Sequence, residues 1–125
     1  MEFPAAHYIH KPLADQKTGE VVVPFCYEAR SFIARQRGLL GQTYLPLGEG
    51  LLLGEPLVHM IGMKIELELL FLDKRGKIVS IYHARPGFRF YGSLKARKTL
   101  ELPVGSIMDL GLHLGQTLVS ASSLA

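Results

Sequence analysis

Residues 64–82 read KIELELLFLDKRGKIVSIY, and this stretch decides the fold class. Apolar and charged residues alternate over 64–69, as in a strand with one buried face, and residues 70–72 make the second face apolar as well. Residues 73–76 have the composition of a hairpin loop, and residues 77–82 alternate again. The pattern predicts an antiparallel hairpin whose first strand begins half-exposed and ends buried on both faces.

Short apolar segments bounded by turn residues flank this hairpin on both sides. Residues 21–23 and 51–53 precede it, and residues 99–102 and 116–120 follow it. Short strands at regular spacing with turn signals between them are typical of small β domains. We therefore expect a mainly β fold, a small antiparallel barrel or sandwich, with about six to eight strands.

Two helical elements are expected beside the strands. Apolar residues recur at helical spacing from Ala29 to Leu40, which predicts a helix over about residues 29–37. Ser106 is a suitable N-cap for a single helical turn over 107–110, and Gly111 follows at the position where glycine often ends a helix. The fold class thus includes one short helix and one helical turn.

The length and composition fit a single domain over residues 1–125. The chain is 48% hydrophobic and carries a formal net charge of +3. Residues 1–20 hold few periodic apolar positions and are expected to be peripheral, and residues 121–125 are expected to be a frayed tail. The start of the chain has neither the basic residues nor the apolar run of a secretory signal, and no apolar run reaches the length of a membrane span. We therefore expect a cytoplasmic protein with no membrane span.

Four stretches carry a resemblance to a known family, and they occur in the same order as in that family. They are Ala29-Arg30 with residues 35–40 (RQRGLL), residues 49–53 (EGLLL), residues 58–63 (VHMIGM) followed by Phe71-Leu72-Asp73 and Gly76, and residues 100–105 (LELPVG) followed by Gly111 and Gly115. Together they resemble the prokaryotic family called domain of unknown function 192. The resemblance implies a mainly β fold and supplies no reaction.

The chain departs from the family pattern at three places. His59-Met60 stands where the family usually has His-Thr, and residues 66–68 (ELE) stand where it has Pro-Ile-Asp. Gly115-Gln116 stands where it often has Gly-Asp. If the family builds a site from that threonine and aspartate, the site of this chain is altered.

The candidate binding residues are His59, Glu68, Arg37 and Glu101. Glu68 could form an acid–base couple with His59, or an ion pair with Arg37. The plainer interpretation is structural: His59 is a hydrogen-bonded histidine of the fold, and Glu68 belongs to a structural ion pair. Contact with His59 would require a bend at Gly62, because a straight strand keeps residues nine positions apart well separated. Glu101 lies between Leu100 and Leu102 and is expected to face solvent. The resemblance adds a possible salt bridge from Glu101 to the motif that holds Arg35 and Arg37.

The sequence holds no recognisable motif for a metal or a cofactor. Its five histidines and one cysteine are not at ligand spacing, and neither a phosphate-binding loop nor a dinucleotide fingerprint is present. We expect no metal and no cofactor. The single cysteine, Cys26, is expected to be buried and inert.

Three functions stay open, and whether the chain is an enzyme is uncertain. The first is a non-enzymatic binding or accessory module with a cleft near His59 and Glu68, whose partner is an unknown protein or a small-molecule ligand. The second is a small hydrolase- or lyase-type enzyme that uses the same two residues. The third is a weak single-stranded nucleic-acid binder through residues 85–98, where five basic residues are interleaved with three aromatic ones. The low net charge argues against nucleic acid. The oligomeric state is not indicated.

Overall fold

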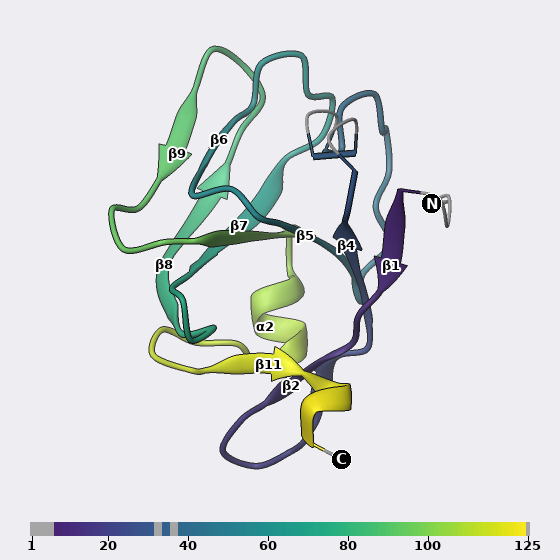
Figure 1. The fold of residues 1–125 in the computed structure, drawn as a ribbon. Coiled ribbons are helices and arrows are strands. Elements are labelled where there is room, and N and C mark those ends of the chain that lie inside the picture. The colour runs from purple at the N-terminus through teal and green to yellow at the C-terminus, as the bar shows by residue number, and fades with distance from the viewer. Residues whose placement is uncertain (1–6, 32–33, 36–37, 125) are drawn as a thin grey trace.

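The computed structural model describes residues 7–31, 34–35 and 38–124. Eleven strands are found in this part of the chain (Figure 1). Their bounds are β1 (Tyr8–His10), β2 (Leu13–Asp15), β3 (Val21–Val23), β4 (Phe25–Ala29), β5 (Glu49–Leu53), β6 (Leu57–His59), β7 (Leu67–Leu72), β8 (Ile78–Ala84), β9 (Phe90–Gly92), β10 (Lys98–Pro103) and β11 (Leu118–Ser120). Two short helices, α2 (Ser106–Leu110) and the 3₁₀-helix η1 (Ala121–Leu124), complete the described elements.

The strands form three sheets. The largest has six strands in the order β1-β4-β5-β10-β7-β8, the second has the order β11-β2-β3, and β6 and β9 form a two-stranded ribbon. All pairs are antiparallel except β4 with β5, which is parallel. Among the described strands β1 and β8 are the two edges of the large sheet, so it does not close into a barrel. The predicted mainly β fold is confirmed, and it is sandwich-like.

The predicted central hairpin is confirmed, and the structure gives its register. β7 pairs with β8 from Leu67 opposite Ala84 to Leu72 opposite Ile78. The loop is closed by Asp73, whose Oδ1 accepts hydrogen bonds from the backbone N–H groups of Arg75 (2.9 Å) and Lys77 (3.0 Å). Desolvation acts to raise the pKa of the Asp73 carboxyl, but these two bonds and the charges of Lys77 and Arg75 together hold it below its usual value. The side chain therefore fixes the turn locally, as asparagines and aspartates often do.

The six-stranded sheet is covered on both faces. On one face Leu70, Leu100 and Leu102 pack with α2 and the β11-β2-β3 sheet in one hydrophobic cluster. On the other face Leu69 and Phe71 belong to a second cluster, which includes residues from the segment 34–45 and from the region of β6. β7 thus contributes to both clusters, as expected for a strand that becomes apolar on both faces.

Ala29 is not helical, contrary to the helix predicted over residues 29–37. It ends β4, which pairs with β1 on one side and with β5 on the other. This two-sided ladder outweighs the helical spacing of the apolar residues, because tertiary pairing overrides a local pattern. Among the described residues of the range 29–37, Ala34 and Arg35 have helical geometry. Ser31 Oγ caps this turn by accepting a hydrogen bond from Ala34 N at 3.0 Å. The remaining predicted positions include 32, 33, 36 and 37, which lie outside the described residues.

Both ends of the chain take part in the fold more than predicted. Leu13 and Ala14 in β2 are buried and belong to the sandwich, so this part of residues 1–20 is not peripheral. The predicted frayed tail forms η1 up to Leu124, and Ala121 N donates a hydrogen bond to Pro12 O at 2.8 Å. Strand pairing between the two ends supplies the order that the local sequence does not indicate.

Gly76 provides a test of how the hairpin loop meets β11. Its φ is 89°, and a Cβ built there would lie 2.1 Å from the carbonyl oxygen of Leu118. Gly115 has nearly the same φ, 87°, but open space around it. We expect Gly115→Ala to lower the free energy of unfolding by about 1 kcal/mol through backbone strain alone. Gly76→Ala should cost at least about 3 kcal/mol, because the backbone must also move.

Denaturant unfolding of the two variants measures the difference. Equal losses of stability would contradict the close contact between Gly76 and β11.

Candidate functional site

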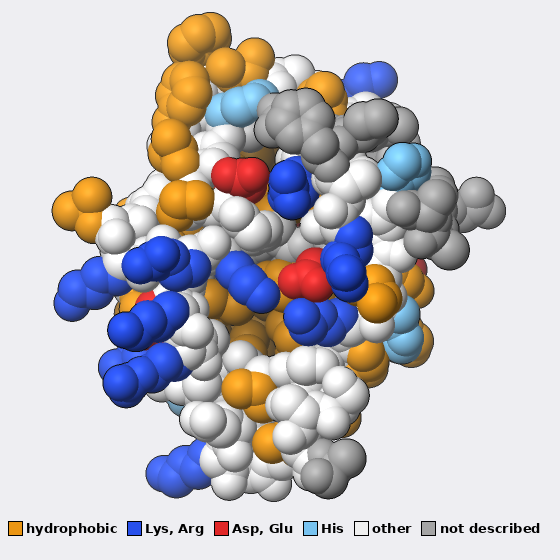
Figure 2. Space-filling model, in the orientation of Figure 1, with side chains coloured by type: hydrophobic (Ala, Val, Ile, Leu, Met, Phe, Trp, Pro, Cys, Tyr) orange, Lys and Arg blue, Asp and Glu red, His pale blue; other side chains and the backbone are white. Residues whose placement is uncertain are grey.

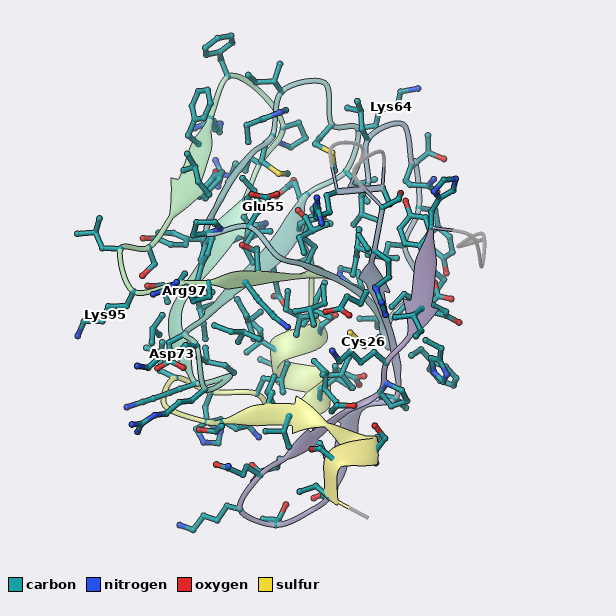
Figure 3. All side chains as sticks on the ribbon, viewed as in Figure 1. Cys26, Glu55, Lys64, Asp73, Lys95 and Arg97 are labelled. Atoms are coloured by element: carbon teal, nitrogen blue, oxygen red, sulfur yellow. The ribbon has the colours of Figure 1, made fainter. Side chains whose placement is uncertain are left out.

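A pocket of about 170 Å³ opens on the face of the large sheet that carries β6. Its walls come from Arg35 and residues 38–40, the connection between β5 and β6, β6 itself and the turn that follows. Figure 3 places Glu55, in that connection, close to β5 and β6 and on the far side of the large sheet from α2. The lining residues are Arg35, Gly38, Leu39, Leu40, Leu53, Glu55, Leu57, Val58, His59, Ile61, Met63 and Glu101.

Glu101 supplies a buried carboxylate to this pocket. It lies on β10 between Leu51 of β5 and Leu69 of β7, and its exposed fraction is 5%. Among the described residues, its Oε1 has no hydrogen-bond partner. Burial raises the pKa of Glu101 from its ordinary value of 4.5 to about 7. A buried polar atom without a partner is rare in native proteins, so this oxygen calls for an explanation.

Gly38 lies directly beside that oxygen. A Cβ built on Gly38 would stand 3.7 Å from Glu101 Oε1 and 3.9 Å from the Leu53 side chain. Because glycine has no side chain, the space next to the carboxylate stays open on this side.

An ion pair stands at the rim of the pocket. Arg35 Nε lies 4.0 Å from Glu55 Oε1, and both side chains are about two-fifths exposed. The large sheet fixes the backbone of Glu55, since the buried Thr99 hydroxyl on β10 donates a hydrogen bond to Glu55 O at 2.6 Å. Thr99 and Glu101 are two residues apart on β10 and therefore face the same side of the sheet. One strand thus positions both the rim and the floor.

His59 lies at the mouth of the pocket and is exposed. Its Nδ1 accepts a hydrogen bond from Ile61 N at 3.2 Å, so the neutral ring carries its proton on Nε2. Its ring meets Phe90 edge-on, with centroids 6.2 Å apart. The backbone turns after His59, where Gly62 has a φ of 79°, so the bend that contact with Glu68 would require is present. His59 is therefore held by local contacts and by the β6–β9 ribbon.

Glu68 does not join His59. Its Oε1 accepts a hydrogen bond from Ile107 N at 2.8 Å and its Oε2 from Gly105 N at 3.1 Å. Glu68 alternates with Leu67 and Leu69 and points to the face that carries α2, away from the pocket. The predicted acid–base couple is therefore not assembled. The alternative partner, Arg37, lies outside the described residues.

Glu68 also takes the capping role predicted for Ser106. Gly105 is the N-cap residue of α2, and Ser106 is the first helical residue. The Ser106 hydroxyl donates its hydrogen bond to Pro103 O at 2.6 Å instead. Two N–H groups at the start of α2, those of Gly105 and Ile107, donate to the Glu68 carboxylate, an arrangement that the helix dipole favours. Gly111 ends α2 with a φ of 68°, as predicted.

The prediction that Glu101 faces solvent is wrong. It was expected to face solvent because Leu100 and Leu102 face the core, and it does point away from them. That other face, however, carries the second hydrophobic cluster. The sequence does hold one signal for this burial. The apolar residues 51–53 predict a further strand of the sheet that is buried on both faces, so packing partners are needed on both sides of the sheet.

Three of the five basic residues in the segment 85–98 lie away from its exposed aromatic rings. Figure 2 shows apolar side chains over β9 and the loop before it, where the exposed rings of Phe88 and Phe90 pack edge to face. Lys95 and Arg97 lie near Asp73 at the hairpin loop instead (Figure 3). Lys98 forms an ion pair with Glu28 at 3.5 Å. The basic end of the segment is thus separated from its aromatic end.

Cys26 is buried, as predicted, and burial raises the pKa of its thiol to about 12. Within the described ranges, no group of three or more His, Cys, Asp and Glu side chains is placed to hold a metal ion. None of the helices in the described part of the chain has the length and apolar character needed to cross a membrane.

The chain belongs to the DUF192 family, described as "Uncharacterized ACR", whose sequence profile matches residues 14–120. A protein of unknown function from Novosphingobium aromaticivorans has a similar structure, with a TM-score of 0.73 and 21% identity, over 86% of this chain and 83% of that one. A protein described as a putative transcription regulator from Sinorhizobium meliloti has a TM-score of 0.69 and 24% identity, over 77% of this chain and 81% of that one. Both come from bacteria, and at these identities they show a shared fold alone. No curated protein matches the chain.

Replacing Glu101 should change how stability depends on pH. The folded protein keeps the Glu101 proton up to about pH 7, whereas an ordinary carboxyl loses it near 4.5. Between these values the folded state binds more protons than the unfolded state, so the free energy of unfolding falls as the pH rises. We expect Glu101→Gln to match the wild type at about pH 4 and to exceed it by on the order of 3 kcal/mol above about pH 7. Urea unfolding at several pH values measures this gap, and a gap that does not change with pH would contradict the buried carboxylate.

Replacing Glu68 should have a different effect. Glu68→Ala leaves the N–H groups of Gly105 and Ile107 without their acceptor, and we expect a loss of about 1–2 kcal/mol. Glu68→Gln keeps one acceptor oxygen and should lose less. Hydrogen exchange should accelerate at the Ile107 amide in Glu68→Ala, and unchanged exchange there would show that Glu68 does not cap α2.

Proposed function

We propose that this protein is a non-enzymatic binding module, and that its pocket holds a polar group of a small ligand or of a partner protein. The observation that carries the proposal is the Glu101 carboxylate, which is 5% exposed, lines the pocket and has an Oε1 without a hydrogen-bond partner among the described residues. Such an atom costs free energy in the empty protein. A ligand that donates a hydrogen bond to Oε1 would recover that free energy.

The size and lining of the pocket support the same function. Its volume of about 170 Å³ is close to that of an engineered cavity, about 150 Å³, that binds benzene. Seven of the twelve described lining residues are leucine, valine, isoleucine or methionine, and the others include the polar side chains of Arg35, Glu55, His59 and Glu101. Binding sites for small molecules commonly combine an apolar wall with a few placed polar groups.

The arrangement supports binding better than a reaction. The hydrolase or lyase alternative required a histidine paired with a carboxylate, and the Glu68 carboxylate caps α2 instead. Among the described residues, no hydrogen bond joins His59 to a carboxylate; His59 Nδ1 is occupied by Ile61 N. Arg35 and Glu55 neutralise each other at the rim. An activated acid–base pair is thus not supported, whereas a hydrogen-bonding pocket is.

A fragment screen tests the proposal. We would titrate the labelled protein with small amines, alcohols, amides and carboxylic acids at millimolar concentration and follow the backbone amide signals. We expect hits that shift the signals of Gly38, Leu53 and His59. Glu101→Leu should abolish them, because it keeps an apolar side chain of similar size but removes the acceptor.

Glu68→Gln is the matched control, since Glu68 lies on the opposite face of the sheet. It should leave the same hits in place. If no fragment binds, or if the shifted signals surround α2 rather than the pocket, the proposed function is wrong.

A further inference from the structure

We infer that the group bound in the pocket is a primary ammonium at the end of a short unbranched apolar chain, with its charge held by the carboxylate of Glu101. This inference rests on the proposed function and names the class of ligand. It follows from the charges that face the pocket, the position of the unpartnered oxygen and the apolar walls.

Among the described residues, the charges that line the pocket leave one negative group uncompensated. Arg35, Glu55 and Glu101 are the charged residues of the described lining, and the exposed His59 lines the pocket as well. Arg35 and Glu55 are paired at 4.0 Å, so their charges cancel. An anionic ligand would meet the buried Glu101 carboxylate and be repelled, whereas a cation would neutralise it.

The burial of Glu101 makes a cation the favoured ligand over a neutral hydrogen-bond donor. The pKa of Glu101 is raised to about 7 by burial, so the empty pocket resists the charged form. An ammonium restores the charged form, and a hydrogen bond between two charged groups is roughly twice as strong as one between neutral groups. A neutral alcohol would gain only the weaker bond.

The shape of the site suits an ammonium on an alkyl chain. Glu101 Oε1 has no hydrogen-bond partner among the described residues, and it can accept a bond from an ammonium, which is a compact point charge. Leu39, Leu53 and Met63 line the pocket and can pack against methylene groups. The volume of about 170 Å³ accommodates a chain of roughly four carbons.

A free alkylamine and the lysine side chain of a partner present this same chemistry. The experiment therefore includes both sources, n-butylamine and Nα-acetyl-lysine methylamide. Butan-1-ol serves as the neutral probe of nearly the same shape. Binding of either amine supports the inference, and the tighter of the two identifies the source.

Calorimetric titrations at about pH 8 compare these probes. We expect n-butylamine to bind at least about tenfold more tightly than butan-1-ol, because only the amine forms the charge-assisted bond. Glu101→Gln should lose at least this factor for the amine and change little for the alcohol. Glu68→Gln should bind both probes like the wild type.

The affinity for n-butylamine should fall by about tenfold between about pH 8 and about pH 6, because the proton on Glu101 must leave before the ammonium is held. Affinity for butan-1-ol should not change. Imidazole can change its charge in the same range, so the titration is repeated with His59→Asn, in which the fall should persist. The pH dependence of the affinity for n-butylamine is measured without a substitution at Glu101, so it tests the inference even if Glu101→Gln fails to fold.

The outcomes separate the inference from the proposed function. If the alcohol binds as tightly as the amines, and Glu101→Gln weakens neither, the pocket binds ligands but not by their charge, and the inference is wrong. If neither probe binds and the fragment screen gives no hits, the proposed function is wrong as well.

Discussion

Strand β10 runs through the middle of the six-stranded sheet, between β5 and β7, and hydrophobic clusters cover both of its faces. Because successive side chains on a strand point to opposite faces, Leu100 and Leu102 enter one cluster and Glu101 must enter the other. A one-residue shift in register would move each of these side chains to the wrong face. The sheet therefore holds a carboxylate at the floor of the pocket as a direct result of its own strand pairing.

Two glutamates on neighbouring strands show how the face decides the role. Glu68 of β7 lies opposite Leu102, and Glu101 of β10 lies opposite Leu69. On the α2 face, both oxygens of Glu68 accept backbone N–H groups at the start of the helix. On the pocket face, Glu101 Oε1 accepts no hydrogen bond from any of the described residues. The first carboxylate stabilises the fold, whereas burial of the second lowers the stability of the folded state near neutral pH.

The parts of the fold that depend on local chemistry could be predicted. The alternation over residues 64–69 and the turn at Asp73 gave the hairpin, and Gly111 gave the end of α2. Ala29 was misassigned because its helical spacing says nothing of the strands that pair with it. Glu101 was misjudged for a similar reason, since the alternation shows that it faces away from Leu100 but not what covers that face. Likewise, the sequence predicts His59 as a candidate residue, while the residues that line the pocket with it come from segments that meet only in three dimensions.

The proposed binding role depends on Glu101 being a buried carboxylate whose Oε1 has no partner among the described residues. The most direct test is a carbon-13 NMR titration of the Glu101 side-chain carboxyl in the free protein. The account predicts a midpoint near pH 7, well above the ordinary value of 4.5. A midpoint at or below 4.5 would show that a cation of the chain already neutralises Glu101, and it would contradict the account.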